Sequence, residues 1–392
     1  AMKEATSASA SVAVGREALG AGVLTGTGNT GLGYTAGKVM TSGNYNTLAG
    51  HKAGLALTTG TSNTFIGNEA GDEQTGSVSN TCIGDQAGQK HTAGYSVMVG
   101  SMAGQYATSA TSLIAIGRQA GQGGSSGSFT GNYNVLIGTT AGALMTTAHS
   151  TTITGHYSGD AITSGVANNI YGYASAQVAT TPDGTCCFGN EALVSLTTGN
   201  ANDCLGVNAL YVLTTGYDNV AIGQASGTAI STGYRNTLLG HEAGQVMTTG
   251  SNNTCIGWTS TPSAATVSNE FTLGNSSIGT LRCQQTSISA LSDARDKTDI
   301  VNSPYGLDFV DTLKPRQFKW ESRDGKVAND GETRLGFIAQ ELLEAADGNN
   351  DVLDLVYENN PEKLEAKYGN LIPVLVKAVQ ELSAKVKELE SK

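Results

Sequence analysis

Charged residues are scarce in this sequence, and their scarcity excludes several kinds of protein. Only 14% of the 392 residues are charged, whereas 52 are glycine, which is unusual for a globular enzyme and indicates a repetitive chain. No run of Lys or Arg occurs and the formal net charge is -11, so neither nucleic acid nor an anionic membrane is an expected partner, because both require clustered positive charge. A stretch of 18 apolar residues and a signal-peptide pattern are also lacking, and we expect no membrane insertion.

Cysteine is sparse as well. The six cysteines are spread over a long chain and two of them, Cys186 and Cys187, are adjacent, whereas disulfide frameworks are typical of short secreted chains. We therefore predict that Cys82, Cys187, Cys204 and Cys255 are reduced, inward-facing apolar fillers. Aspartate is nearly missing from the glycine-rich part, which argues against calcium-binding glycine repeats. No metal or cofactor is expected.

The charges that do occur gather at the C-terminal end. Residues 292–392 hold 14 Lys/Arg and 20 Asp/Glu, which leaves 8 and 13 for the first 291 residues. This shift predicts a boundary near residue 290. The expected organisation is a leading linker over 1–10, a glycine-rich β-repeat shaft over 11–280, a linker over 281–291, and a separate C-terminal domain over 292–392.

The glycine-rich part is a repeat of about 17 residues. One glycine, here called the anchor glycine, recurs in an apolar-Gly-x-x-Ala-Gly motif, and 12 of the 15 intervals between anchors are 17 residues long. The anchors are Gly15, Gly33, Gly50, Gly67, Gly84, Gly100, Gly117, Gly138, Gly155, Gly172, Gly189, Gly206, Gly223, Gly240, Gly257 and Gly274. A fixed short period predicts stacked coils, each of which buries its apolar face against its neighbours.

Two apolar columns precede the anchors. The near column, one residue before the anchor, contains Val14, Leu32, Ile66, Ile83, Val99, Ile116, Ile137, Phe188, Leu205, Ile222, Leu239, Ile256 and Leu273, with Ala49, Thr154 and Tyr171 departing. The far column, two residues before it, contains Leu48, Phe65, Cys82, Ala115, Leu136, Ile153, Ile170, Cys187, Cys204, Ala221, Leu238 and Cys255. Successive strand residues point to opposite faces, so both faces need burial and the second face predicts a partner chain.

Small and polar positions complete the repeat. Three residues after each anchor only Ala or Ser occurs, from Ala18 to Ser277, and ten coils then have Gly, as in Gly37 and Gly244, which suits a corner with positive φ. Seven residues before the anchor, several coils close a turn with Gly. Asparagines recur four residues before the anchor, where stacked amides could hydrogen-bond from coil to coil. They are Asn46, Asn63, Asn80, Asn134, Asn202, Asn219, Asn236 and Asn253.

Three features of the repeat region could suggest a site. The Gly26–Gly31 segment resembles part of a nucleotide-binding loop, but the repeat already explains its glycines. The histidines His51, His156 and His241 each follow an anchor but lie several coils apart, so we expect solvated surface residues rather than metal ligands.

The 21-residue interval between Gly117 and Gly138 contains extra residues around Gly123–Ser128, followed by Phe129 and Tyr133. A protruding loop there is either a contact point or a tolerated insertion.

The shaft resembles the parallel β-rolls of trimeric autotransporter adhesins and the repeat shafts of phage fibres, whose coils also carry Ile-Gly-x-x-Ala. The resemblance covers roughly residues 11–280. It implies a mainly β fold, a trimeric parallel β-roll or β-helix shaft, with the chains either coiled separately or intertwined. A smaller α+β domain would follow it.

The C-terminal region resembles a second family. It begins Leu291-Ser292-Asp293-Ala294-Arg295-Asp296-Lys297-Thr298-Asp299-Ile300, and further motifs follow in order. They are Gly306-Leu307, Leu313-Lys314-Pro315, Phe318-Lys319-Trp320, Gly336-Phe337-Ile338-Ala339-Gln340-Glu341, Tyr368 and Leu371-Ile372-Pro373-Val374-Leu375. These motifs are similar to the self-cleaving intramolecular chaperone domain at the end of phage tail fibres, tailspikes and endosialidases.

That resemblance implies cleavage between Leu291 and Ser292. Ser292 would be the nucleophile, Lys297 its base, and Asp293 and Arg295 supporting residues. The region contains no histidine, so a Ser-His-Asp arrangement within it is excluded, and lysine is the remaining candidate base if it is kept neutral. The same residues also fit a simpler interpretation, in which Ser292-Asp293 caps a helix that begins near Ala294.

The tail predicts a short parallel coiled coil. Ile372, Val379 and Val386 recur at one heptad core position, and Leu375, Leu382 and Leu389 recur at the other. β-branched residues at the first position with leucine at the second favour dimers in isolated peptides, whereas the resembled family is trimeric, and we expect a trimer.

The hypothesis that follows is a viral tail-fibre protein of the virion, folded in the host cytoplasm. Its C-terminal domain would drive homotrimer formation in register and then cut the chain before Ser292, once and in cis. The shaft would bind a host cell-surface receptor, which a glycan could provide. Two alternatives stay open, a tailspike depolymerase acting on polysaccharide and a trimeric bacterial adhesin. With only 13 acidic residues in the first 291, a catalytic carboxylate pair is not evident.

Overall fold

The computed structural model describes residues 9–20, 23–124, 128–284, 292–321 and 331–392. It divides into two compact units, one ending at Leu273 and the other running from Gly274 to Lys392. The described residues of the first unit form strands and turns without a helix, as the repeat predicts. Residues 1–8 of the expected leading linker and 285–291 of the expected second linker lie outside the described ranges.

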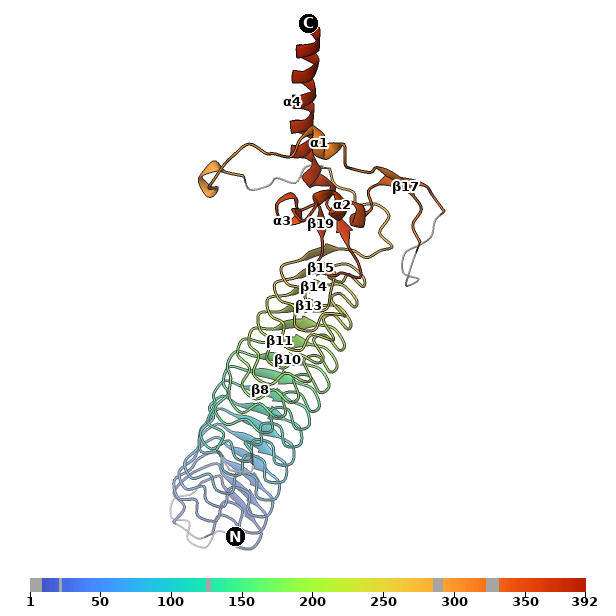
Figure 1. The fold of residues 1–392 in the computed structure, drawn as a ribbon. Helices are drawn as coiled ribbons and strands as arrows, with labels where there is room; N and C mark the ends of the chain where they lie inside the picture. Colours follow the sequence, from blue (N-terminus) through green and yellow to red (C-terminus); the bar gives the residue numbers. More distant parts are fainter. Residues whose placement is uncertain (1–8, 21–22, 125–127, 285–291, 322–330) are drawn as a thin grey trace. The chain divides into compact units, whose positions relative to one another are not determined.

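The first unit is a parallel β-solenoid in which each repeat supplies one three-residue strand. The strands are β1 (Val12–Val14), β2 (Thr30–Leu32), β3 (Thr47–Ala49), β4 (Thr64–Ile66), β5 (Thr81–Ile83), β6 (Val97–Val99), β7 (Ile114–Ile116), β8 (Val135–Ile137), β9 (Thr152–Thr154), β10 (Asn169–Tyr171), β11 (Cys186–Phe188), β12 (Asp203–Leu205), β13 (Val220–Ile222), β14 (Thr237–Leu239), β15 (Thr254–Ile256) and β16 (Phe271–Leu273). They stack in sequence order as one 16-stranded sheet (Figure 1). The predicted mainly β fold is confirmed.

The two apolar columns of the strands face opposite sides. Each repeat pairs with the next in exact alignment of the motif, so Phe65 lies beside Cys82 and Ile66 beside Ile83. Far-column residues such as Phe65 are fully buried inside the coils. The near column lies on the outer surface of the single chain, where Leu32 is 50% and Leu205 is 53% exposed. The strands are therefore apolar on both faces, as predicted, and one of these faces stays open to solvent.

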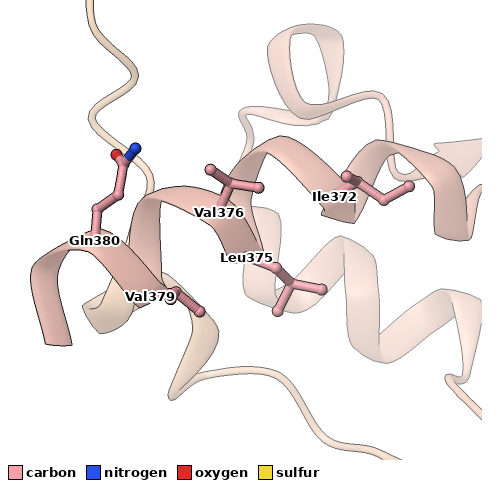
Figure 2. A pocket seen from close by; sticks show the side chains of 5 residues that line it. All are labelled: Ile372, Leu375, Val376, Val379 and Gln380. Carbon is pink, nitrogen blue, oxygen red and sulfur yellow. The ribbon is translucent and has the colours of Figure 1, made fainter. Parts of the chain in front are cut away.

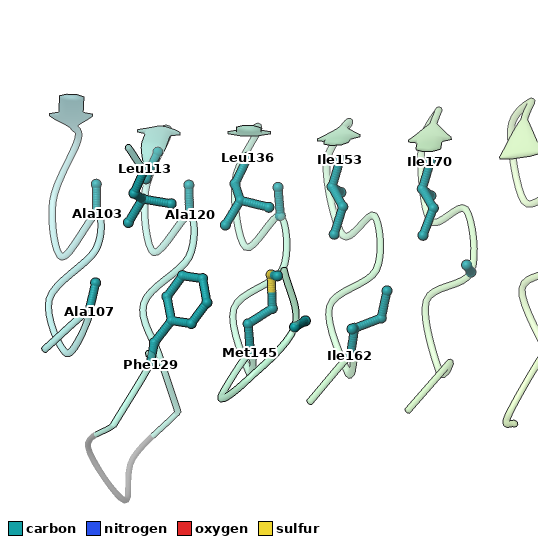
Figure 3. Packing of buried hydrophobic residues seen from close by; sticks show 14 of the residues in the cluster. Ala103, Ala107, Leu113, Ala120, Phe129, Leu136, Met145, Ile153, Ile162 and Ile170 are labelled. Carbon is teal, nitrogen blue, oxygen red and sulfur yellow. The ribbon is translucent and has the colours of Figure 1, made fainter. Parts of the chain in front are cut away.

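The core of the solenoid lies between the strands and an opposite wall, and Figure 3 shows both walls from close by. Leu136, Ile153 and Ile170 point inward from the strands, and Phe129 and Met145 point towards them from the opposite turn. The small residues three positions after the anchors are buried beside these side chains, apart from the exposed Ser277 after the last anchor, and this burial explains why only Ala or Ser occurs there. A larger residue would have no space because core packing is dense.

The anchor glycines are required by both conformation and space. Gly155 has φ +145, a region that is essentially restricted to glycine, and a Cβ atom on it would lie 2.0 Å from the carbonyl oxygen of Gly172. The glycine four residues after the anchor also has positive φ, for example 59° at Gly37, as predicted. Several coils place a leucine in this left-handed conformation instead, as at Leu193 with φ 55.

The asparagines four residues before the anchors form the predicted coil-to-coil ladder. The Asn236 Nδ2 group donates to Asn219 Oδ1 at 3.0 Å, and the Asn253 backbone N–H donates to Asn236 Oδ1 at 3.0 Å. These side chains are buried, and each amide also binds a backbone carbonyl, as Asn236 does with Gly250 at 3.0 Å. The buried amides of this ladder therefore have hydrogen-bond partners. Asn29 and Asn168 belong to the same column, although the sequence analysis did not include them.

The cysteines and histidines occupy the places that their repeat positions predict. Cys82, Cys187, Cys204 and Cys255 are buried free thiols, and burial raises the pKa of Cys82 to about 12 and that of Cys255 to about 11. Both thiols are therefore poor nucleophiles at neutral pH. The side chains of His51, His156 and His241 are exposed.

A fourth histidine, His91, is buried in the solenoid core. Its Nδ1 atom lies 2.6 Å from the Ala107 carbonyl oxygen, and its Nε2 atom has no hydrogen-bond partner among the described residues.

The second unit is a small α+β region that ends in a long helix. Its elements are η1 (Ala294–Asp296), α1 (Leu307–Val310), β17 (Arg316–Phe318), β18 (Arg334–Gly336), α2 (Ala339–Ala346), α3 (Asn350–Leu353), β19 (Val356–Tyr357), β20 (Glu365–Ala366), η2 (Tyr368–Asn370) and α4 (Leu371–Glu390). Strands β17 and β18 pair antiparallel, as do β19 and β20. Its core contains Leu342, Leu355, Val356, Leu371 and Val374. Pro373 is tolerated in α4 because it lies in the first turn.

Candidate self-cleavage site

A tight turn organises the residues around Ser292. Asp293 caps η1, and its Oδ1 atom accepts from the backbone N–H of Arg295 at 2.9 Å. The Arg295 guanidinium returns to the same carboxylate, with Nη2 2.6 Å from Oδ2 and Nε 3.0 Å from Oδ1. These bonds hold the pKa of Asp293 below its usual range, first through the Arg295 side chain and then through its N–H. Asp293 and Arg295 thus stabilise the turn through their mutual hydrogen bonds.

The turn brings Ser292 and Lys297 together. The Lys297 backbone N–H donates to the Ala294 carbonyl at 3.3 Å and so reverses the chain direction. The Lys297 Nζ atom then lies 2.5 Å from the Ser292 Oγ atom. The contact joins two residues five apart in sequence, the pair that the resemblance implies as nucleophile and base. The capping interpretation also holds in part, because Asp293 does cap a helix, although that helix is a short 3-10 turn.

The pair is exposed to solvent in the single chain. All residues from Ser292 to Ile300 are exposed, and Leu291, whose carbonyl would be attacked, lies outside the described residues. Serine becomes a nucleophile when a base removes its proton, and lysine is such a base only as a neutral amine, which removal of surrounding water favours. The geometry therefore supplies a nucleophile and a base in contact, but not the desolvation that would activate them.

The helix α1 is joined to α4 by a carboxylate. The Glu381 Oε2 atom on α4 accepts from the backbone N–H of Leu307 at 2.7 Å, at the start of α1. A Cβ atom on Gly306 would lie 2.3 Å from this oxygen, so a side chain at position 306 would displace the Glu381 carboxylate. The N–H of Leu307 first, and Lys377 next, lower the pKa of Glu381. The sequence analysis did not single out Glu381; its only signal was the glycine that makes room for it.

Two further contacts explain motif residues around β17 and β18. The Tyr368 Oη atom accepts from the Phe337 backbone N–H at 3.1 Å, and a Cβ atom on Gly336 would lie 2.6 Å from this hydroxyl. Arg316 forms a two-pronged ion pair with Glu341, with Nη2 2.6 Å from Oε1. These residues form the scaffold of the second unit rather than a second reactive site.

The face of α4 that carries the heptad residues is uncovered in the single chain. Ile372 is 62% and Val379 is 65% exposed, while the opposite face buries Leu371, Val374 and Ala378. Ile372, Leu375, Val376, Val379 and Gln380 line an apolar hollow of about 330 Å³ on this face (Figure 2). The predicted helix is confirmed, and its apolar stripe is available for another chain.

The described parts of both units contain no group of three or more His, Cys, Asp or Glu side chains placed to hold a metal ion. Within the same residues, every helix is too short or too polar to cross a membrane.

Comparison with known proteins places the C-terminal region in context. Residues 292–351 match the protein family described as "chaperone of endosialidase". The match begins at Ser292, the residue expected to follow the cleaved bond. The motifs around Tyr368 and α4, which the sequence resemblance also included, lie beyond the matched range. No curated protein matches the chain. The molecule is thus a parallel β-solenoid followed by a C-terminal region whose residues 292–351 are similar to the endosialidase chaperone family.

Proposed function

We propose that the chain is a trimeric viral tail fibre that attaches the virion to a host cell and is assembled by its own C-terminal region. After trimer formation this region would cut the chain between Leu291 and Ser292. The observation that carries the proposal is the family match that starts at Ser292, directly after a repetitive β-solenoid. Chains with such near-identical repeats can pair out of register, and an intramolecular chaperone would prevent this.

The near column supports assembly of several chains through the strand face. Leu32, Ile66, Leu205, Ile222 and Leu273 are between 39% and 53% exposed, in one line along the sheet. A continuous apolar stripe on a soluble protein marks an interaction surface, because its exposure to water is unfavourable. The stripe has the same length in every copy, which fits identical chains packed side by side in parallel.

The outer face of α4 supports the same oligomer from the other end of the chain. Its heptad residues are all exposed, with Leu389 at 70% and Leu382 at 50%. Coiled-coil packing of three copies would cover them. A helical clamp forms quickly from local contacts, whereas parallel strand pairing between distant residues is slow.

A clamp matters because the solenoid alone cannot define its register with a partner. Near-column residues repeat every 17 positions in most coils, so two chains shifted by one coil would still match apolar residues with apolar residues. Three chains joined at their C-termini start without such a shift. Cleavage afterwards would leave a fibre that cannot unfold by the reverse route, which is kinetic stabilisation.

The chemistry proposed for the cut uses two side chains. Ser292 Oγ attacks the Leu291 carbonyl carbon, Lys297 Nζ takes the hydroxyl proton, and the peptide nitrogen of Ser292 leaves with a proton as a new amino terminus. The resulting ester between Leu291 and the serine hydroxyl is then hydrolysed by water. Because the pair is exposed in one chain, burial by neighbouring chains is the step that would switch it on.

Cleavage can be tested together with assembly. The purified protein should be a trimer by light scattering, and mass spectrometry should find fragments of 291 and 101 residues. Ser292→Ala and Lys297→Ala should leave the chain whole and still trimeric. Asp293→Asn should slow the cut less, since it only supports the turn.

Intact wild-type chains in a stable trimer would remove the peptidase part of the proposal and keep the chaperone part. A wild-type monomer at micromolar concentration would remove both.

A further inference from the structure

The shaft is regular except at one place, the long interval between Gly117 and Gly138. After the inserted residues the chain lies in the solenoid core at Phe129, which is fully buried. In Figure 3, Phe129 occupies the same wall as Ala107, Met145 and Ile162 of neighbouring coils. The base of the insertion is thus fixed by a core aromatic residue. Phe129 belongs to the core, and Tyr133 is the aromatic residue at the surface.

A small hollow of about 260 Å³ lies directly after this return. Its lining residues are Thr130, Gly131, Asn132, Tyr133, Thr147 and His149. Glycine is needed at position 131 because a Cβ atom there would lie 1.8 Å from the Ala148 carbonyl oxygen. Behind it, the buried Asn134 amide donates to the carbonyls of Gly131 and Ala148, at 3.0 and 2.9 Å. The floor of the hollow is therefore rigid.

Some polar groups of the hollow form hydrogen bonds with the backbone of Thr111, and others form none with the described residues. Asn132 Oδ1 accepts from the Thr111 backbone N–H at 2.8 Å, and the Tyr133 backbone N–H donates to the Thr111 carbonyl at 3.1 Å. Within the described residues, the Asn132 Nδ2 group, the Tyr133 hydroxyl and the Thr147 hydroxyl have no intramolecular hydrogen bond. Tyr133 is 66% exposed. A hydrogen-bonded frame thus presents one aromatic ring, two hydroxyls and an amide to solvent.

The chemistry of this hollow points to one class of ligand. We infer that it binds a neutral sugar residue of a surface glycan, an inference that rests on the proposed attachment function. A sugar ring has an apolar C–H face that fits an aromatic ring and a rim of hydroxyls that fits amide and hydroxyl groups.

Size and charge support the same class. The volume is slightly below the usual range for drug-sized ligands, which suits one sugar ring of a longer glycan. No Asp, Glu, Lys or Arg lines the hollow, and the chain has a net charge of -11, so acidic sugars and phosphates have no counter-charge there.

The repeat provides matched controls for the aromatic contact. Tyr45 and Tyr95 lie five residues before their anchors, as Tyr133 does, and all three have positive φ, between 57° and 63°. Tyr45 is 68% and Tyr95 is 70% exposed, close to the value for Tyr133. Only Tyr133 of the three lies in the hollow. Comparing the Tyr→Ala substitution at the three positions therefore distinguishes binding in the hollow from nonspecific binding to exposed tyrosines.

The test is an array of defined neutral and acidic oligosaccharides, probed with the full-length protein and followed by titration of the best neutral oligosaccharide. Tyr133→Ala should weaken binding by about tenfold or more, Tyr133→Phe and Thr147→Val should weaken it less, and Tyr45→Ala and Tyr95→Ala should leave it unchanged.

Retained affinity in Tyr133→Ala, or binding of acidic oligosaccharides only, would overturn the inference, as would the absence of any bound sugar. Light scattering on the same samples reports assembly separately, and because the hollow lies within one chain, the sugar result counts whether or not trimers form.

Discussion

The solenoid is built from one repeated set of contacts, whereas the C-terminal unit is built from contacts that each occur once. In the solenoid one contact is repeated many times, as the asparagine ladder and the anchor glycines show, and each coil contacts mainly its neighbours. In the C-terminal unit each contact occurs once, such as Glu381 with Leu307 or Tyr368 with Phe337. Repetition gives a long, stable rod but no unique alignment between chains, whereas unique contacts can define an alignment. In the proposed trimer the two regions would therefore depend on each other during assembly.

The largest effect is expected from breaking the clamp alone. Val379→Asp combined with Leu382→Asp places charges on the exposed face of α4, where a single chain tolerates them but a coiled coil does not. We expect loss of trimers by light scattering and loss of cleavage on a denaturing gel. Lys387→Gln, an exposed change on α4 outside the heptad core, is the control. Trimers that survive the double substitution would show that the solenoid sets the alignment without the helix.

The next effect comes from disturbing one repeat of the solenoid. Gly155→Ala introduces a Cβ atom 2.0 Å from the Gly172 oxygen in a backbone conformation reserved for glycine. A loss of about 3 kcal/mol or more is expected, measured as a lower apparent melting temperature by circular dichroism at a fixed scan rate. Gly279→Ala, with no atom within 4 Å of the new Cβ, should change little. Equal behaviour of the two variants would contradict the steric argument.

A smaller effect is expected from one member of the asparagine ladder. Asn236→Ala removes the acceptor for the Asn253 N–H and the donor to Gly250, which leaves buried polar groups without partners. The expected cost is about 2 kcal/mol. Urea denaturation should report it, with the exposed Asn190→Ala as control. If the two substitutions lower the denaturation midpoint equally, the ladder contributes nothing beyond the backbone hydrogen bonds.

The smallest effect concerns pH and the buried His91. Burial lowers the pKa of His91 below its usual value, so its contribution to stability is complete above the unfolded pKa and falls as the solution is acidified. His91→Leu, which copies the leucine at the equivalent position of other coils, should reduce the loss of melting temperature between pH 7 and pH 5. The exposed His156→Leu should not.

Asp72 acts in the opposite direction over the same range. Burial, and then the nearby Glu69, raise the pKa of Asp72 to about 6, so its protonation on acidification stabilises the fold. Asp72 is present in both wild type and His91→Leu, so its contribution cancels when the pH dependence of their melting temperatures is compared. An unchanged pH dependence in His91→Leu would show that His91 does not limit stability in acid.

Much of the solenoid was predictable because its constraints are local and repeated. The buried far column, the small residues near Ala18, the asparagine ladder and the glycine corners all follow from columns of the aligned repeats. The place of Phe129 was not predictable, because the sequence does not say whether an aromatic residue beside an insertion turns inward or outward. Nor did the repeat indicate that His91 would fill a core position. Both outcomes depend on how much space the neighbouring coils leave.

The residues of the candidate cleavage site could be proposed from the sequence, but their exposure to solvent could not. The contact between Ser292 and Lys297 follows from resemblance and from a five-residue spacing across a turn. The solvent exposure of this pair does not follow from the resemblance or from the spacing, because burial depends on groups whose positions in space a single sequence does not give. Glu381 could not be found from sequence for a similar reason: it lies 74 positions from its partner, Leu307.

The interruption of the asparagine ladder has a mechanical consequence. Inter-strand hydrogen bonds run from coil to coil, so tension along the rod would load them directly, and the coil interfaces act as links in series. At Leu113 the ladder position holds a side chain without an acceptor, between Ser96 and Asn134, and the next coil carries the insertion. In the proposed attachment fibre, a pull between virion and cell would load this interrupted coil interface, which lies beside Tyr133, close to the point at which a bound sugar would apply the force.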